Sequence, residues 1–209
     1  MFQRHFVLAA LVGTALSMAS SATSHASINL EFRPFVQVVN VGDSFDVGFY
    51  AVSDDLSDQS IASIDLIMDW DPAFIQLTGL NNNGPYAWSE STFPDDSAGD
   101  DVNGTFADGN AFYRAFRDFP PADPAFATPA GLLVTTFTFD ALALTPGTEL
   151  DMLATFGNFS QTRVQDGEMA GLDVTGTLGS ATIIILPEPS TILMGVLALG
   201  ILRRRPRRV

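Results

Sequence analysis

The stretch Ile61-Ala62-Ser63-Ile64-Asp65-Leu66-Ile67-Met68-Asp69-Trp70-Asp71-Pro72 decides the fold of this chain. Its apolar residues recur at every second position, from Ala62 through Leu66 to Trp70. This period of two is typical of a half-buried β-strand, whereas an amphipathic helix would repeat every three or four residues. Asp71-Pro72 then ends the strand, because proline has no backbone N–H to donate and an Asp-Pro pair favours a turn.

The same alternation recurs on both sides of this stretch. Ile28, Leu30, Phe32, Val36 and Val38 share one parity, and so do Phe45, Val47, Phe49 and Ala51. Further strands are expected at 74–80, 132–141, 150–156 and 181–186, with turns such as Pro146-Gly147 between them. Eight or nine strands with almost no helical period predict an all-β fold, a two-layer antiparallel β-sandwich of the jelly-roll type.

The alternation lapses between Asn81 and Asn110, where Asn, Gly, Pro, Ser and Asp dominate. A loop of this length is unusual inside a compact domain. It is either a flexible surface insertion or a binding loop, and the residues leave both interpretations open. Tyr86 and Trp88 lie in it, where their rings could stack on sugar faces or on a partner protein, or could anchor the loop to the core.

The same loop contains five carboxylates, a residue type that calcium favours as a ligand. They are Asp95, Asp96, Asp100, Asp101 and Asp108. The spacing is not that of an EF-hand, because Gly104 follows Asp101 by three positions rather than five. The loop is therefore either a calcium site or simply a solvated acidic segment, and no other cofactor is expected.

The amino-terminal segment has the organisation of a signal peptide. Arg4 precedes an apolar stretch from Phe6 to Met18, and Ser24-His25-Ala26 supplies small residues at the −3 and −1 positions of a cleavage site. We therefore predict that a signal peptidase removes residues 1–26, which form a signal helix, and that the exported protein begins at Ser27. An uncleaved anchor or a buried first helix is the alternative.

The carboxyl terminus combines three parts. Pro187-Glu188-Pro189 comes first, an uncharged apolar run from Thr191 to Leu202 follows, and residues 203–209 read Arg-Arg-Arg-Pro-Arg-Arg-Val. As a transmembrane helix the apolar run would span about 20 Å, less than the roughly 30 Å of a bilayer's hydrocarbon core, so it would anchor the protein weakly. This order of parts resembles the PEP-CTERM sorting signal of exported bacterial proteins, which an exosortase is thought to cut near the Pro-Glu-Pro motif.

The resemblance implies three regions and a route. Residues 1–26 are the signal peptide, 27–186 the exported domain and 187–209 the sorting signal with a short transmembrane helix. The positive-inside rule places the arginines of 203–208 in the cytoplasm and the domain outside. The protein would then pass through the inner membrane of a Gram-negative bacterium, be processed by an exosortase-like enzyme, and reach the cell surface or the extracellular matrix.

Composition excludes several function classes. Between residues 27 and 186, 23 Asp and Glu residues stand against four Arg residues, a formal charge of −19 that would repel nucleic acid. The only histidines, His5 and His25, lie in the predicted signal peptide, and the chain has no cysteine and no lysine. The exported domain therefore lacks a Ser-His-Asp triad, a Cys-His pair, an ordinary zinc site and a Schiff-base lysine.

Carboxylates remain as reactive groups, so the enzyme class to consider is a glycosidase that acts through a pair of carboxylates. Asp69 and Asp71, if both lie on one strand, face the same side about 7 Å apart, close to the separation of such pairs. Because any strand with alternate acids offers this geometry, we expect a protein that is not an enzyme.

Three segments resemble cohesin domains and, more widely, carbohydrate-binding-module-like sandwiches. They are Val41-Gly42-Asp43-Ser44-Phe45-Asp46-Val47, the stretch from Ile61 to Leu77 with its Asp71-Pro72, and Leu132 to Phe139 followed by Pro146-Gly147-Thr148. The resemblance implies a cohesin-like sandwich over residues 27–186. No second segment looks like the paired calcium loops of a dockerin, and the insertion at 81–110 departs from a compact cohesin.

Together these features predict an exported surface or matrix protein with a structural or adhesive binding role, its partners being exopolysaccharide or surface proteins. The alternative is a carbohydrate-binding module for matrix glycans that uses Tyr86, Trp88 and the acidic loop, with or without calcium.

Overall fold

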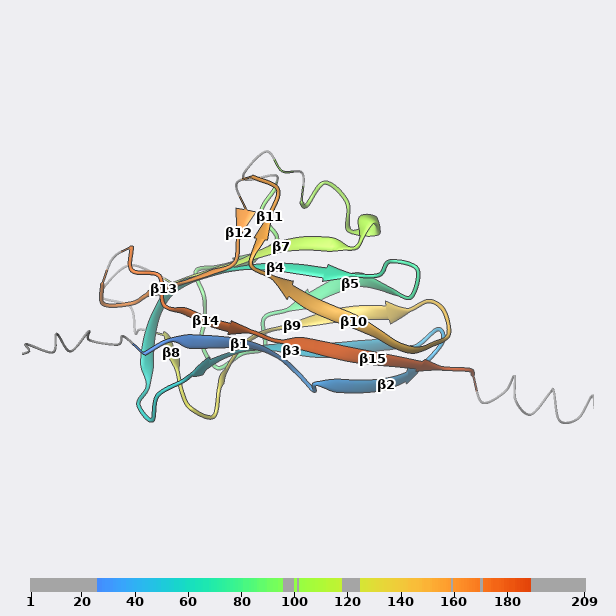
Figure 1. Ribbon diagram of the computed structural model, residues 1–209, viewed down its shortest axis with the longest axis horizontal. Helices are drawn as coiled ribbons and strands as arrows, with labels where there is room; N and C mark the ends of the chain where they lie inside the picture. Colours follow the sequence, from blue (N-terminus) through green and yellow to red (C-terminus); the bar gives the residue numbers. More distant parts are fainter. Residues whose placement is uncertain are drawn as a thin grey trace, which may run out of the picture.

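The computed structural model describes residues 26–95, 100, 102–117, 125–158, 160–169 and 171–188 (Figure 1). The expected signal helix, the apolar run with its arginine tail, and Pro189 lie outside these residues, as do Asp96 and Asp101. Within the described residues, no helix is long and apolar enough to cross a membrane.

The described chain folds into two β-sheets and a small hairpin. The five-stranded sheet has the order β14-β1-β3-β9-β5, with bounds β1 Ile28–Arg33, β3 Ser44–Ser53, β5 Ile75–Asn81, β9 Leu132–Ala141 and β14 Thr175–Leu178. The eight-stranded sheet follows β2-β15-β10-β4-β7-β6, with β8 and β13 also paired to β4. Its bounds are β2 Val36–Asn40, β4 Gln59–Trp70, β6 Glu90–Thr92, β7 Asn110–Phe116, β8 Ala125–Ala127, β10 Thr145–Leu153, β13 Arg163–Asp166 and β15 Ser180–Leu186. The hairpin joins β11 Thr155–Phe156 to β12 Ser160–Gln161, and a short 3₁₀ turn, η1, spans Phe106–Asp108.

The alternation predicted for β4 is confirmed from Ile64 to Trp70, whereas at its start Ile61 joins the core in place of Ala62. Ile64, Leu66 and Met68 point into the space between the sheets and are fully buried, while Asp65 and Asp69 point outward. Trp70 closes the strand by packing edge-on against Phe139 of β9, with ring centroids 5.6 Å apart. Two facing sheets with this inward parity form a two-layer sandwich, as the sequence predicts.

Aromatic rings fill the centre of the sandwich. Phe137 of β9 is fully buried and meets Phe32 and Phe49 from its own sheet at centroid distances of 6.4 and 6.1 Å. From the opposite sheet, Tyr113 packs edge-on against Phe137 at 5.3 Å. Because the chain has no cysteine, this packing provides the cohesion that disulfides give many exported domains.

The first strand region departs from the prediction. One continuous parity from Ile28 to Val38 was expected, but Pro34 separates β1 in the five-stranded sheet from β2 in the other sheet. Proline donates no backbone hydrogen bond, so a sheet ladder does not continue through it. The parity shifts across this break: Val39 becomes the buried residue of β2, and Val36 and Val38 face solvent.

The last strand region divides in the same way. β14 pairs with β1 and β15 pairs with β2, and both pairings are parallel, whereas the other strand pairs are antiparallel. Figure 1 shows β14 and β15 following one another across the sandwich, so the first and last strand regions run together through both sheets. The expectation of a wholly antiparallel sandwich is therefore wrong at these two pairs.

The long segment after β5 is ordered where it is described. It contributes β6 to the edge of the eight-stranded sheet and then η1. Phe93 and Phe106 pack against the core, with ring centroids 5.0 Å apart. The Asn103 side chain donates to the carbonyls of Pro94 and Phe112 and accepts from the Phe112 N–H. The insertion thus closes one side of the sandwich.

The aromatic packing predicts a graded response to ring removal. Phe137→Ala should lower the free energy of unfolding by about 3–5 kcal/mol, because it empties a site enclosed by four other rings. Phe126→Ala is the control, since this ring is 40% exposed and its loss should cost less than about 1 kcal/mol. Urea denaturation measures both, and equal losses would contradict the assignment of the core.

Candidate interaction surface

The outer face of the eight-stranded sheet presents the residues that alternate with the core positions. These are Asp65, Ile67 and Asp69 of β4, Glu149, Asp151 and Leu153 of β10, Thr182, Ile184 and Leu186 of β15, and Val36 and Val38 of β2. They divide into a covered zone, an acidic zone and an apolar zone.

The covered zone lies over β4 and β7. Ile67, Val102 and Phe112 form a small buried cluster with Leu153 and Phe156 packed against it. The β11–β12 hairpin and the segment near residue 102 therefore close this part of the face to a partner.

Side-chain hydrogen bonds fix the hairpin on the sheet. Thr162 accepts a hydrogen bond from the Ile67 N–H at 2.9 Å and donates to the Leu153 carbonyl at 2.5 Å. The Asp100 carboxylate accepts from the backbone N–H groups of Asn158 and Ser160, at 3.1 and 2.8 Å.

The acidic zone lies over the junction of β4 and β10. Asp69 and Asp151 occupy directly paired positions on these antiparallel strands, and Glu149 lies two residues along β10. Burial raises the pKa of Asp69, and the neighbouring Asp151 raises it further. The pKa of Asp151 is also raised, first by burial and then by Glu149. Asp151 thus makes Asp69 harder to ionise, and Glu149 does the same to Asp151.

Asp71 does not join this group. β4 ends at Trp70, and the Asp71 carboxylate accepts a hydrogen bond from the Ala73 N–H at 2.9 Å within the turn that follows. The pair Asp69 and Asp71 is therefore not the strand-borne arrangement on which the glycosidase hypothesis depended.

Arg114 of β7 neutralises the next acid along β4. Its Nε donates to Asp65 at 2.8 Å, and the two residues occupy paired positions on neighbouring strands. This hydrogen bond raises the pKa of Arg114. The arginine therefore belongs to the sheet surface rather than to a free cationic site.

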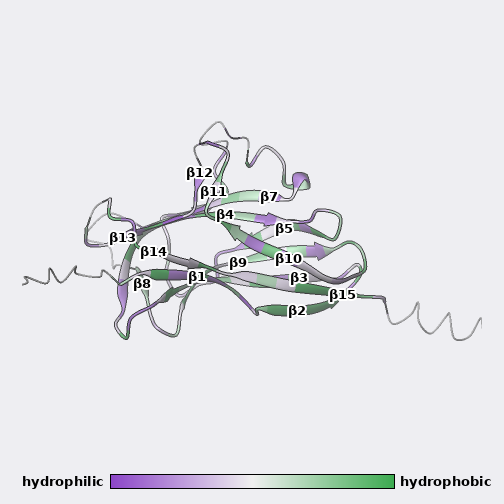
Figure 2. Cartoon of the chain, viewed as in Figure 1, coloured by the Kyte–Doolittle hydropathy of each residue, from purple (hydrophilic) through white to green (hydrophobic). Residues whose placement is uncertain are grey.

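The apolar zone lies along β2 and the end of β15. We call it the β2 edge, and it consists of Phe35, Val36, Val38 and Leu186, which are 54%, 56%, 55% and 45% exposed. Figure 2 shows β2 and the end of β15 as largely hydrophobic. Val38 lies beside Ile184 of β15 in the parallel register. No charged residue lies between Phe35 and Val39.

β2 is also the last strand of its sheet, so one side of its backbone is open. Thr182 N–H donates to the Phe35 carbonyl and Val41 N–H donates to the Leu186 carbonyl, both at 2.9 Å. In a parallel ladder the residues that bond the neighbour alternate with those that face away, so Val36 and Val38 direct their backbone groups to the open side. An exposed apolar edge of this kind is a template for strand addition.

Tyr86 and Trp88 lie between β5 and β6. Their ring centroids are 4.9 Å apart in an edge-to-face contact, and both rings are partly buried against the core. The Trp88 Nε1–H is buried and has no hydrogen-bond partner among the described residues. The two rings therefore contact each other, and each also packs partly against the core of the sandwich.

The structure describes three of the five acidic-loop carboxylates. Asp95 is exposed, Asp108 lies in η1, and Asp100 binds the hairpin backbone. Among the described residues, no group of three or more carboxylates, histidines or cysteines could hold a metal ion. Asp96 and Asp101 lie outside the described residues, so the five-carboxylate calcium hypothesis remains a prediction.

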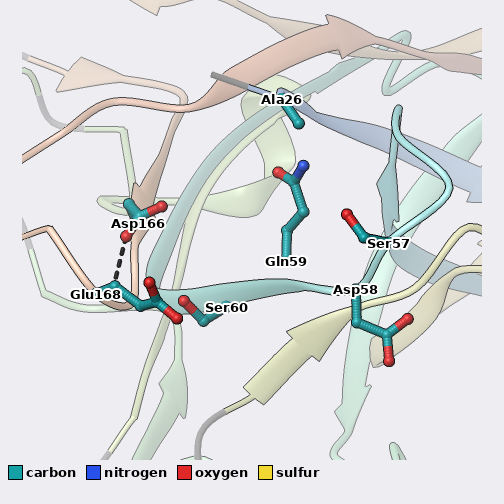
Figure 3. Close-up of a pocket in the computed structure, with 7 residues that line it drawn as sticks. All are labelled: Ala26, Ser57, Asp58, Gln59, Ser60, Asp166 and Glu168. Atoms are coloured by element: carbon teal, nitrogen blue, oxygen red, sulfur yellow. Dashed lines mark hydrogen bonds between the residues drawn. The ribbon is translucent and has the colours of Figure 1, made fainter. Parts of the chain in front are cut away.

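The two predicted processing sites border the sandwich. β1 begins at Ile28, directly after Ser27, and β15 ends at Leu186, directly before Pro187. Ala26 lines a shallow hollow of about 180 Å³ whose other walls are polar (Figure 3). Those walls are Ser57, Asp58, Gln59, Ser60, Asp166 and Glu168. The core strands lie inside these limits.

Sequence reasoning missed the β2 edge and the partner of Asp69. The signal for the first was Pro34, which breaks the parity that had placed Val36 and Val38 in the core. The pairing of Asp69 with Asp151 joins residues 82 positions apart. Local patterns contain no information about such a register.

We predict that removing one charge from the acidic zone raises the free energy of unfolding, by an amount that depends on pH. Because the folded protein raises the pKa of Asp69 and Asp151, it holds their protons more tightly than the unfolded chain, and stability falls as pH rises from about 4 through the raised values. Asp151→Asn should therefore raise the free energy of unfolding at pH 7 by about 0.2–1 kcal/mol, the range for screened cross-strand charges. Urea denaturation between pH 3 and 7 tests this.

The gain should disappear at pH 3, where both carboxyls are protonated in either state. The double variant Asp69→Asn with Asp151→Asn is the control and should be less stabilising than the sum of the single changes. A gain from Asp151→Asn that is the same at pH 3 and pH 7 would contradict the coupling.

Comparison with known proteins identifies the fold. No protein-family model matches the chain, and no curated protein sequence matches it. Among solved structures, the seventh ScaB type I cohesin from Pseudobacteroides cellulosolvens is similar with a TM-score of 0.55 and 11% identity, over 78% of this chain and 94% of that one. The third ScaC cohesin of Acetivibrio cellulolyticus, solved in complex with the ScaB dockerin, has a TM-score of 0.55 and 10% identity, over 76% and 99%.

The cohesin module of a family 33 glycoside hydrolase from Clostridium perfringens matches with a TM-score of 0.52 and 11% identity, over 78% of this chain and all of that one. At these identities the likeness concerns the fold alone. Residues 27–186 therefore form a cohesin-like β-sandwich, as the three sequence segments predicted.

Proposed function

We propose that this chain is an exported binding module that attaches to a protein partner at the cell surface or in the extracellular matrix, in a structural or adhesive role. The main support is the β2 edge, where an uncharged strand exposes Val36 and Val38 and has an open backbone, on a domain of formal charge −19. An extended segment of a surface or matrix protein would add to this strand through main-chain hydrogen bonds and cover Val36 and Val38.

The fold supports a protein partner. A structure with the same sandwich, the ScaC cohesin of Acetivibrio cellulolyticus, was solved bound to a dockerin. In this chain the β11–β12 hairpin covers part of the outer face, which leaves the β2 edge as the more accessible apolar surface. The absence of histidine and cysteine from residues 27–186 supports binding rather than catalysis.

Delivery to the surface follows the route that the two chain ends suggest. The buried side chains of the last strand, Ile183 and Ile185, lie before Pro187, so a cut near Pro187-Glu188-Pro189 would remove no core strand. The sandwich would be released intact from its weak anchor by an exosortase-like enzyme after the signal peptidase has acted.

The first test concerns processing. Intact-mass spectrometry of the protein recovered from the surface of the producing bacterium should find a chain that begins at Ser27 and ends close to Pro187-Glu188-Pro189. Replacing these three residues with Ala-Ala-Ala should leave the protein in the membrane fraction with Val209 retained. A surface form that still ends at Val209 would contradict the sorting proposal.

The second test concerns the β2 edge. Val38→Lys should lower the amount of protein retained on cells or matrix roughly ten-fold, the effect of losing one interface contact worth about 1.4 kcal/mol. Thr177→Lys is the matched control, because Thr177 is an exposed residue of β14, the edge strand of the other sheet. Quantitative immunoblotting of washed cells measures both, and equal retention of the two variants would overturn the assignment of this edge.

A glycan-binding module is the second candidate, and the contact between Tyr86 and Trp88 is the observation in its favour, because both rings are partly exposed on one loop. A glycan array, run with and without a chelator of calcium, distinguishes it from protein attachment. Binding that Trp88→Ala abolishes while Val38→Lys leaves it intact would replace the first proposal with this one.

A further inference from the structure

Ser27 is held at three points by a single residue, Asp54, in the connection between β3 and β4. The Ser27 backbone N–H donates to Asp54 Oδ1 at 2.7 Å, and the Ser27 hydroxyl donates to Asp54 Oδ2. The Asp54 N–H in turn donates to the Ser27 carbonyl at 3.0 Å. The next residue, Ile28, already belongs to β1, and its N–H donates to the Val174 carbonyl at 2.8 Å.

The first of these hydrogen bonds changes in kind if the chain is cut after Ala26. Hydrolysis of that peptide bond adds water across it, so Ala26 leaves with a carboxylate and Ser27 keeps its nitrogen as an α-ammonium group. The nitrogen is already in hydrogen-bonding contact with a carboxylate oxygen, so a neutral donor becomes a cationic one without movement of the backbone. Charge-assisted hydrogen bonds of this type are about twice as strong as neutral ones.

The charged groups around this position are mostly acidic. Asp55 and Asp58 follow Asp54 in the same connection, and Asp166 and Glu168 line the hollow beside Ala26 (Figure 3). The neighbouring cations have other partners: Arg117 donates to the Gly167 carbonyl, and Arg163 lies 3.9 Å from Asp173. A positive amino terminus would therefore be attracted to this end of the sandwich.

We propose that Asp54 is the binding site for the α-ammonium group of the mature protein, so that removal of the signal peptide creates an ion pair that fastens the start of β1 to the β3–β4 connection. This inference rests on the proposed cleavage after Ala26. Processing then has a structural effect beyond release, because the unprocessed chain has only an amide at this position.

The composition of the chain makes the α-amino group of Ser27 directly observable. There is no lysine, so the α-amino group of Ser27 is the only primary amine of the exported domain. Acetic anhydride labelling, read by mass spectrometry at a series of pH values against a free peptide with the sequence Ser-Ile-Asn-Leu, reports the reactivity of this amine alone.

The test uses the full chain, exported with its own signal peptide, as wild type and as Asp54→Asn. At pH 8 the wild-type amine should be acetylated roughly three-fold or more slowly than that of Asp54→Asn, because an ion pair raises its pKa above the ordinary 7.7–8.0. Asp58→Asn is the matched control, since it removes the same charge from the same connection, and it should label like the wild type.

Thermal unfolding provides an independent readout. A raised amine pKa stabilises the folded state at pH values below the pKa of the amine in the unfolded chain. This stabilisation is lost as pH rises through the pKa of the amine in the folded protein. Asp54→Asn should therefore lower Tm by about 2–4 °C at pH 7, and the difference should narrow above about pH 9. If Asp54→Asn does not fold, the titration of the wild-type amine against the free peptide still decides the question.

The possible failures are distinguishable. A mature chain that does not begin at Ser27 would overturn the processing step and the ion pair with it. A chain that begins at Ser27, but whose amine reacts like that of the free peptide and whose Tm responds equally to Asp54→Asn and Asp58→Asn, would overturn the ion pair and leave the processing proposal intact.

Discussion

The packing of aromatic rings between the two sheets is the interaction on which the rest of this structure depends. Phe137 and Phe49 of the five-stranded sheet meet Tyr113 of the opposite sheet, and all three are fully buried. With no cysteine in the chain, the sheets are held together by burial alone, and each ring adds to the area removed from water. The outer faces and edges of the sheets are then free to differ in chemistry, because they are not required for cohesion.

The sequence was sufficient for the architecture because strand alternation is a local property. In β3 from Phe45 to Ala51 and in β4 from Ile64 to Trp70 every second residue faces the core. Asp71-Pro72 and Gly42-Asp43 mark turns through their own backbone preferences. Gly42, for example, has φ of +85°, a conformation that glycine adopts without strain. Fold class therefore followed from the pattern, and the solved cohesins agree with it.

The surface features were harder to predict because they depend on which strands become neighbours. Val36 and Val38 continue the parity of β1, and only the transfer of β2 to the other sheet turns them outward. Asp151 meets Asp69 through the register of two strands distant in sequence. Ser27 and Asp54 also meet only because β1 pairs antiparallel with the end of β3. These contacts result from tertiary pairing, which alternation within a single strand does not encode.

In the proposed role, the negative charge of the domain and the apolar β2 edge serve one function together. A domain with a formal charge of −19 repels other copies of itself over most of its surface, which favours solubility. Proteins usually protect an open edge strand with charged residues, yet β2 has none between Phe35 and Val39. An apolar edge that stays exposed to water on such an acidic domain is unfavourable. The proposed protein partner at the cell surface or in the matrix would remove this cost by covering the β2 edge. The β2 edge ends at Leu186, directly before Pro187, so the proposed cut near Pro187-Glu188-Pro189 would fall beside this edge and leave its strands intact.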